Sequence, residues 1–244
     1  MATLGVLVMQ TYFISDLHLH DARPHCVDAF VRYLAERRSE DRLYILGDLF
    51  EAWIGDDFTT PMISRVKSAL EQCPAELFMQ HGNRDFLIGQ EFAQTCGVSL
   101  LPEECVIDIA GDRTLLMHGD SLCTKDEAYM KVRPMLRDPN FQSALLEKSI
   151  AERLQIATDA RSESSEHTQS TDLDIMDVTP AAVIQTMHSH SVKTLIHGHT
   201  HRPFDHQNVL PDGTGRRLVL GDWNEYGWHI TTGSTGLILE RFTL

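Results

Sequence analysis

Six short apolar segments, each followed at once by a polar turn, recur along the chain. Each segment is rich in β-branched or aromatic residues, and the turn after it contains Gly, Asp, Asn or His, which is typical of buried strands that end in tight turns. The six predicted strands cover residues 12–14, 43–46, 77–79, 115–117, 194–196 and 218–220.

Apolar residues at helical spacing lie between several of these strands. Val27, Phe30, Val31 and Leu34 form one apolar stripe, and the segment 63–73 contains a second. Strands that alternate with helices predict an α/β fold, a layered sandwich of β-sheets flanked by helices, with ligand sites at the carboxyl ends of the strands. We therefore expect the polar turns to share one rim.

The segment from about residue 125 to residue 174 interrupts this alternation. It predicts an inserted helical lid within a single domain of residues 1–244. Asp138 and Pro139 are typical of a helix cap and first turn, and Leu146, Ile150 and Leu154 recur at helical spacing together with Ala157. Residues 162–174 are polar and lack periodicity, so we expect a loop or mobile lid segment there.

The composition restricts the classes of partner. The length of 244 residues and the hydrophobic content of 42% predict a globular domain. The net charge of -14 disfavours broad adhesion to nucleic acid. A phosphate-rich substrate must therefore be attracted locally, and bound divalent cations provide such an attraction.

The cysteines and the first residues bear on the compartment. Five scattered cysteines indicate neither a disulfide framework nor a thiolate zinc site, which favours a reducing cytoplasm. Residues 1–9 are apolar but lack a basic flank, so we expect no targeting signal, and translation starts at Met1 or Met9.

The polar turns contain the residues with the strongest chemical signal. Carboxylate and amide oxygens combined with imidazoles suit Mn²⁺, Fe or Zn²⁺, and two cations roughly 3.5–4 Å apart can hold both oxygens of a phosphoryl displacement. Each motif alone is equally typical of a helix cap or a packed histidine, but five of them after strands favour a metal site. The motifs are Asp16-Leu17-His18, Gly47-Asp48, Gly82-Asn83-Arg84-Asp85, His118-Gly119-Asp120 and His197-Gly198-His199-Thr200-His201.

These motifs resemble the calcineurin-like metallophosphoesterase pattern D-x-H, G-D, G-N-[HRD], G-H and G-H-x-H, over residues 16–203. The resemblance implies that one metal is held by Asp16, His18 and His199, and the other by Asn83, His118 and His197. It further implies that Asp48 bridges the metals, that bridging solvent is the nucleophile, and that the catalytic residues are Asp48, Asn83, Arg84 and His118. We expect His20, His81 and His201 to lie beside the ligands without binding metal.

Longer segments are similar to the UDP-2,3-diacylglucosamine hydrolases (diphosphatases) of lipid A biosynthesis. They include YILGDLFEAWIGDD at 44–57, HGNRDFLIG at 81–89 and IHGHTHRP at 196–203. The resemblance implies two Mn²⁺ ions per chain, water attack on the phosphorus next to uridine, and release of UMP and 2,3-diacylglucosamine 1-phosphate. It also implies peripheral association with the cytoplasmic face of the inner membrane, and we infer neither a nucleic-acid partner nor an obligate protein partner.

The substrate contacts follow from the same resemblance. Arg84 stands where many relatives carry His, and an arginine can grip phosphate oxygens, which favours a diphosphate. Trp53, Phe86 and Leu87 are either pocket walls or core, and Asp126 is either a sugar contact or a helix-start acid. Thr168 and Thr171 occupy lid positions where relatives commonly carry Asn and Lys. The expected substrate contacts are Asn83, Arg84, Asp126, Ser164, Thr168, Thr171 and His197.

Two alternative functions remain open at this point. A soluble nucleotide phosphodiesterase or dinucleoside polyphosphate hydrolase would use the same metals, although it would have no use for an apolar insertion. A non-catalytic scaffold with the same fold is the other alternative, and the intact set of ligands disfavours it.

Overall fold

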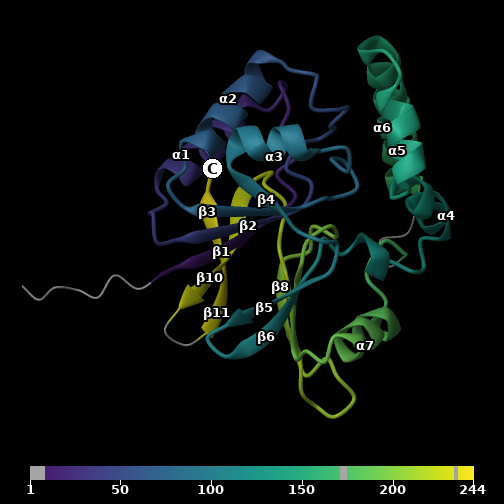
Figure 1. Cartoon of the computed structure of the whole chain (residues 1–244). Coiled ribbons are helices and arrows are strands. Elements are labelled where there is room, and N and C mark those ends of the chain that lie inside the picture. Colours follow the sequence, from purple (N-terminus) through teal and green to yellow (C-terminus); the bar gives the residue numbers. More distant parts are fainter. Residues whose placement is uncertain (1–8, 171–174, 234–235) are drawn as a thin grey trace, which may run out of the picture.

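Two β-sheets form the core of the computed structural model, which describes residues 9–170, 175–233 and 236–244 and, for residues 164–170, the backbone alone (Figure 1). The first sheet has the order β11 (Gly236–Thr243), β10 (Tyr226–Gly233), β1 (Thr11–Ile14), β2 (Arg42–Leu46), β3 (Glu76–Gln80) and β4 (Val98–Leu100). The second has the order β5 (Cys105–Ile109), β6 (Asp112–Leu116), β7 (Thr194–His197), β9 (Arg216–Val219) and β8 (Phe204–Gln207).

The six predicted strands are confirmed, and they divide equally between the two sheets. β1, β2 and β3 are parallel in the first sheet, and β6, β7 and β9 are parallel in the second. Parallel strands end at the same edge of a sheet, so each sheet collects its polar turns at one edge. The predicted rim is therefore built from the carboxyl edges of two sheets.

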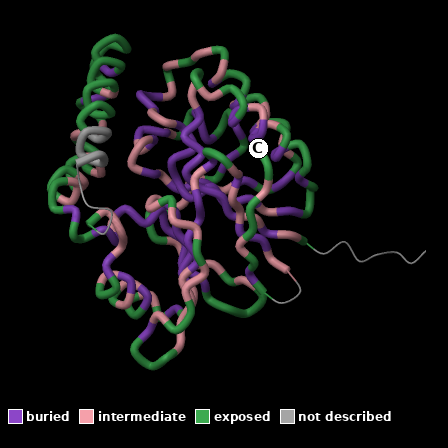
Figure 2. Tube along the Cα trace, turned by 180° about the vertical axis from the view of Figure 1, so that it is seen from behind, coloured by how far each residue is buried: buried purple, intermediate pink, exposed green. Residues whose placement is uncertain are grey.

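Buried side chains form clusters on both faces of each sheet, and Figure 2 shows that the buried parts of the chain trace lie mainly at the centre of the molecule. Phe13 and Leu46 of the first sheet pack with Leu116 and Ile196 of the second. Helices α1 (Pro24–Ala35), α2 (Pro61–Glu71) and α3 (Gln90–Cys96) cover the outer face of the first sheet, and α7 (Pro180–Ser189) covers the second. The predicted layered α/β fold is confirmed.

Three helices occupy the segment that the sequence predicts as an insertion. They are α4 (Glu127–Leu136), α5 (Pro139–Leu146) and α6 (Ile150–Ser170), which follow the short η1 turn (Asp120–Leu122) and lie along one side of the core (Figure 1). Asp138 caps α5 and Pro139 begins it, as predicted. Across the described ranges, no helix is long and apolar enough to cross a membrane.

The predicted loop over 162–174 is wrong for residues 162–170, which continue α6. Ser149 and Glu152 cap the start of this helix reciprocally, because Ser149 N donates to Glu152 Oε2 at 2.9 Å and Glu152 N donates to Ser149 Oγ at 3.3 Å. Once nucleated, a helix gains one hydrogen bond for each added residue, so residues without an apolar pattern can extend it. Residues 171–174 lie outside the described residues.

Candidate metal centre

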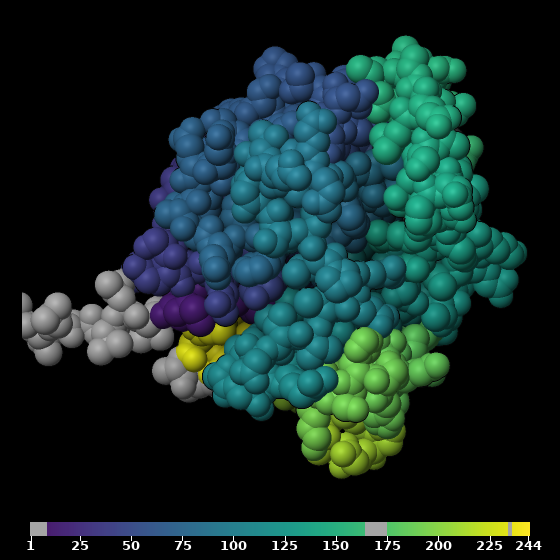
Figure 3. All heavy atoms as spheres, viewed as in Figure 1, coloured from purple at the N-terminus to yellow at the C-terminus, as the bar shows by residue number. Residues whose placement is uncertain are grey.

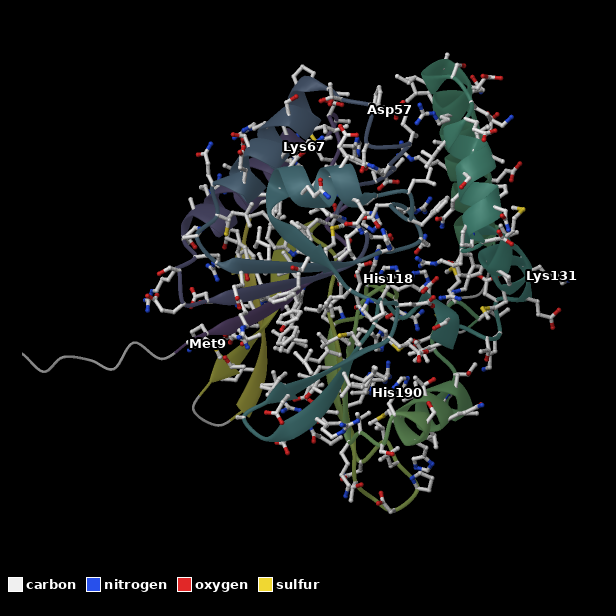
Figure 4. The ribbon with its side chains drawn as sticks, in the orientation of Figure 1. Met9, Asp57, Lys67, His118, Lys131 and His190 are labelled. Carbon is white, nitrogen blue, oxygen red and sulfur yellow. The ribbon has the colours of Figure 1, made fainter. Side chains whose placement is uncertain are left out.

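Five polar turns meet where the carboxyl edges of the two sheets approach each other. Figure 4 shows His118 between the sheets and helices α4–α6. The turns after β1, β2 and β3 contribute Asp16, His18, Asp48 and Asn83, and those after β6 and β7 contribute His118, His199 and His201.

Backbone strain is concentrated in these turns. Residues with φ between 47° and 66° include Asp16, His18, Asp48, His199 and His201. This left-handed conformation costs a residue other than glycine on the order of 1 kcal/mol. Such outliers cluster at functional sites, where the direction of a side chain matters more than the local energy of its backbone. Their concentration here indicates a functional site independently of the residue types.

Two glycines allow the carboxylates to pack against neighbouring turns. A Cβ atom on Gly82 would collide with Asp48 Oδ1, and one on Gly198 would collide with Asp16 Oδ2. Any larger residue at either position would therefore push a carboxylate out of the site.

Three lone-pair atoms converge on one side of the site. Asn83 Oδ1 lies 3.1 Å from His118 Nε2 and 2.9 Å from His199 Nδ1, and the two imidazole nitrogens are 3.2 Å apart. A triangle of possible metal-ligand atoms is therefore formed by three different turns, which contribute Asn83, His118 and His199.

A second group of donors lies on the other side of Asp48. His201 Nε2 is 3.4 Å from Asp16 Oδ1 and 3.2 Å from His18 Nε2. Asp48 Oδ2 lies 3.8 Å from His18 Nε2 and 3.7 Å from His118 Nε2, so this oxygen is almost equally distant from both groups. The arrangement is that of two sites with one carboxylate between them.

These distances fit divalent cations. Ligand atoms about 2.1 Å from a metal and about 90° apart are separated by about 3.0 Å. The shortest distances in both groups are close to this value, and combined carboxylate, amide and imidazole donors suit Mn²⁺, Fe or Zn²⁺. The residues therefore fit the metals that the sequence predicts.

The histidines are arranged differently from the prediction. His199 lies beside Asn83 and not with His18, while His201, expected only to neighbour the ligands, lies beside Asp16 and His18. Both nitrogens of His197 face other groups: Nε2 lies 3.0 Å from Arg217 Nη1, and Nδ1 lies 2.8 Å from Gly198 O. Since arginine can only donate, His197 Nε2 accepts, and this ring is not available to a cation in the present arrangement.

The chain offered a signal for this arrangement. It contains two histidine pairs spaced by two residues, His197 with His199 and His199 with His201, and only the second pair follows a glycine, Gly198. That second pair is the one the structure brings to the donor groups.

The pKa values of the two histidines differ. Burial and the nearby His118 lower the pKa of His199 to about 4. Burial acts in the same direction on His201, but the hydrogen bond and charge of Asp16 outweigh it and raise the pKa to about 9. A ligand imidazole must be neutral, so cation binding beside Asp16 would displace a proton from His201.

The buried carboxylate of Asp85 holds two of the turns together. It accepts hydrogen bonds from Leu49 N at 2.8 Å, Gly82 N at 2.8 Å and Asp48 N at 3.3 Å. Burial and the neighbouring Asp48 raise the pKa of Asp85. Asp85 thereby fixes Asp48 relative to Asn83, a role that the sequence pattern did not predict.

A largely apolar cavity of about 390 Å³ adjoins the donor groups. Figure 3 shows the segment of α4–α6 lying against the core along the side where this cavity lies. Trp53, Phe86 and Leu87 line the cavity and also belong to or pack against the core, so both predicted roles hold. Asn83 and Arg84 lie at its wall, which places the cavity directly beside the candidate metal centre.

The cavity face of the inserted helices differs from the predicted stripe. Leu146, Ile150 and Leu154 are exposed and are not among the residues that line the cavity. The lining residues from α5 and α6 include Leu145, Ile156, Ala157 and Ala160. The break between α5 and α6 separates Leu146 from the rest of the predicted stripe, and of that stripe Ala157 alone is a lining residue of the cavity.

The remaining predicted substrate contacts fall into two groups. Asp126 is buried and caps α4 by accepting from Tyr129 N at 3.0 Å, so it fills the helix-start role. Ser164 and Thr168 belong to α6, but their side chains lie outside the described residues, as does all of Thr171. The five cysteines are all free.

Comparison with known proteins gives a consistent result. A family described as Calcineurin-like phosphoesterase matches residues 9–203. A UDP-2,3-diacylglucosamine hydrolase from Pseudomonas paraeruginosa is 48% identical over 232 residues, which cover 93% of this chain and 97% of the relative. The protein of the same name from Chromohalobacter salexigens is 48% identical over 228 residues, covering 91% and 92%.

Proposed function

Because this chain belongs to the calcineurin-like phosphoesterase family, we propose that it hydrolyses the pyrophosphate bond of UDP-2,3-diacylglucosamine, the compound that its relatives' names contain. The products are UMP and 2,3-diacylglucosamine 1-phosphate. The observation that carries the proposal is a double group of metal donors beside an apolar cavity. A purified protein that releases UMP from this substrate with Mn²⁺ present, as measured by chromatography, would satisfy the first test.

The proposed metal ligands form two groups. Asn83, His118 and His199 hold one cation, Asp16, His18 and His201 hold the other, and Asp48 lies between them. Two bound cations supply an activated water molecule and stabilise the negative charge that develops on the phosphoryl oxygens. The donor types suit Mn²⁺, Fe or Zn²⁺, and we propose two Mn²⁺ ions per chain because the resemblance to the UDP-2,3-diacylglucosamine hydrolases implies them.

Arg84 is the proposed diphosphate-binding residue. Its backbone N donates to Asp48 Oδ1 at 2.9 Å, which fixes the residue beside the proposed bridging carboxylate. A guanidinium group can bind two phosphate oxygens at once. Asn83 contributes a neutral amide, which limits the negative charge that a diphosphate would meet in the site.

The apolar cavity is the proposed site for the acyl chains. Its walls come from α4–α6 and from the segments that follow β2 and β3, so the lipid part of the substrate lies next to the diphosphate part. Leu146, Ile150 and Leu154 are exposed, and we propose that these side chains contact the cytoplasmic face of the inner membrane. Residues 125–161 contain seven Lys and Arg and six Asp and Glu, in a chain whose net charge is -14, so anionic lipid repels this segment less than it repels the chain as a whole.

Chelation should abolish hydrolysis. After treatment with EDTA and removal of the chelator, we expect no UMP release, because the proposed nucleophile is a water molecule that the bound cations activate. Adding MnCl₂ should restore turnover, and elemental analysis should give about two Mn per chain. Metal-free protein that retains full activity, or protein saturated by a single cation, would contradict the two-cation proposal.

A charged side chain introduced into the cavity should weaken hydrolysis of the lipid substrate without affecting hydrolysis of a small phosphodiester. We expect Ala157→Asp to lower kcat/KM for UDP-2,3-diacylglucosamine by about 100-fold, since acyl chains would have to pack beside a hydrated carboxylate on the cavity wall. Hydrolysis of bis(p-nitrophenyl) phosphate should be unchanged, and Thr158→Asp, on the exposed side of the same helix, is the matched control. Equal losses for both substrates would instead favour a soluble phosphodiesterase whose cavity has no role in recognition.

A further inference from the structure

Glu51 lies between a proposed metal ligand and helix α6. Its Oε2 is 3.1 Å from His18 Nδ1, and its Oε1 accepts from Arg161 Nε at 3.1 Å. The Glu51 side chain is 18% exposed and that of Arg161 is 45% exposed. One carboxylate therefore contacts the metal centre with one oxygen and the inserted helices with the other.

The two ring nitrogens of His18 face different groups. Nε2 faces Asp48 and His201, whereas Nδ1 faces Glu51. The Nδ1–Oε2 contact is close but not aligned as a hydrogen bond, and no aligned partner for Nδ1 exists among the described residues. Glu51 is thus the group that can fix the orientation of this ring after a small rotation, as carboxylates commonly do for metal-bound histidines.

Helix α6 is fastened to the same segment at a second point. The Arg153 side chain is almost fully buried, donates from Nη1 to Ile54 O at 2.6 Å and to Asp57 Oδ1 at 2.7 Å, and pairs through Nη2 with Asp57 Oδ2. Arg153 and Arg161 are eight residues apart, so they lie on the same side of the helix about two turns from each other. Two arginines of α6 therefore hold the segment from Glu51 to Asp57, which follows the turn containing Asp48.

We propose that Glu51 is a positioning residue that couples the docking of α6 to cation affinity at the His18 site. This inference rests on the proposed function, because it requires His18 to bind a cation. Docked α6 holds Glu51 through Arg161, Glu51 orients His18 through Nδ1, and the oriented ring binds metal through Nε2. By reciprocity, a cation at His18 must favour the docked position of α6 to the same extent.

Manganese binding tests this coupling directly. Metal-free protein is titrated with MnCl₂, and free Mn²⁺ is measured by electron paramagnetic resonance for wild type, E51Q, R161A, E51Q/R161A and the control Q155A. We expect E51Q to weaken one of the two sites by about 10- to 100-fold and to leave the other unchanged. The melting temperatures of the metal-free proteins show whether E51Q has disturbed the fold instead.

Arg161→Ala has a smaller expected effect, about threefold weaker binding at the same site. Arg161 is partly exposed, so its charge is screened, and the dominant consequence is loss of order in the Glu51 carboxylate. In the E51Q background the same change should have no further effect, and Q155A should bind Mn²⁺ like wild type. Hydrogen exchange at residues 150–163 should slow on adding Mn²⁺ in wild type and change much less in E51Q.

The outcomes separate the two proposals. If wild type binds two Mn²⁺ ions and E51Q binds both with unchanged affinity, the coupling is overturned while the proposed function stands. Equal effects of R161A in both backgrounds would also overturn it, because the arginine would then act by another route. If wild type binds no Mn²⁺, both the coupling and the proposed function are overturned.

Discussion

Asp48→Asn should lower kcat/KM for UDP-2,3-diacylglucosamine by at least about 1,000-fold, since the bridging position contributes several kcal/mol of transition-state stabilisation. Asp48 Oδ2 lies at almost equal distances from His18 Nε2 and His118 Nε2, and an amide supplies neither a negative charge nor two equivalent oxygens. Asparagine retains one oxygen that can accept from Arg84 N, so the turn itself should remain folded. UMP release and the number of bound Mn²⁺ ions per chain are the measurements.

Cys123→Ala is the control for this variant. Cys123 is buried a few residues beyond His118, and burial raises the pKa of its thiol to about 12, so it is neutral and unreactive at ordinary pH. Its replacement should change kcat/KM by less than about threefold, within the range of a small core truncation. Wild-type turnover in Asp48→Asn would refute the bridging role.

His201→Gln should remove the cation beside Asp16 and lower turnover by at least about 100-fold, whereas His197→Gln should keep both cations. The reason is positional: His201 Nε2 lies within 3.4 Å of Asp16 and His18, while His197 faces Arg217 and Gly198 O. Elemental analysis after Mn²⁺ loading distinguishes the two variants. The opposite result, with metal lost from His197→Gln alone, would support the partition that the sequence suggested.

His197→Gln is still expected to affect stability. His197 is fully buried, and burial together with the charge of Arg217 lowers its pKa to about 3, so it is neutral in the folded protein. A glutamine can accept from Arg217 but fills the space differently, so the melting temperature should fall while the metal content does not.

The strands and the location of the site could be predicted because both depend on short-range patterns. A buried strand must be apolar, and a turn that binds metal must be polar, so each of the six strand and turn units is visible in a few residues. The meeting of turns such as Asp48 and His118 follows from parallel topology, in which strands end at a common edge. The division of these strands between two sheets did not follow, because strand pairing depends on contacts between residues distant in the sequence.

The proposed arrangement of the histidines differs from the predicted one for a local reason. His197, His199 and His201 alternate along the turn, so a shift of two residues gives an equally regular pair. Which pair faces the metal centre depends on Arg217, which lies on a different strand and donates to His197 Nε2. No rule of sequence spacing reveals this contact. The role of Asp85 and the proposed role of Glu51 were also hidden, since their partners are backbone groups of other turns or side chains of another turn and of helix α6.

The end of α6 could not be predicted because hydrophobic periodicity reports burial and not helicity. Residues 162–170 have no apolar stripe, yet they continue a helix that Ser149 and Glu152 begin. The predicted apolar stripe was only partly right, since Ala157 lines the cavity whereas Leu146, Ile150 and Leu154 are exposed.

Activity and thermal stability place opposite demands on the five residues of the metal centre that have a left-handed backbone, Asp16, His18, Asp48, His199 and His201. Glycine or asparagine adopts this conformation at less cost, so either one at these positions would make metal-free protein more resistant to heat while it removes or weakens a proposed metal ligand. A population selected for heat resistance alone would therefore drift toward inactive sequences. Laboratory evolution of a hardier variant must screen for hydrolysis in every round.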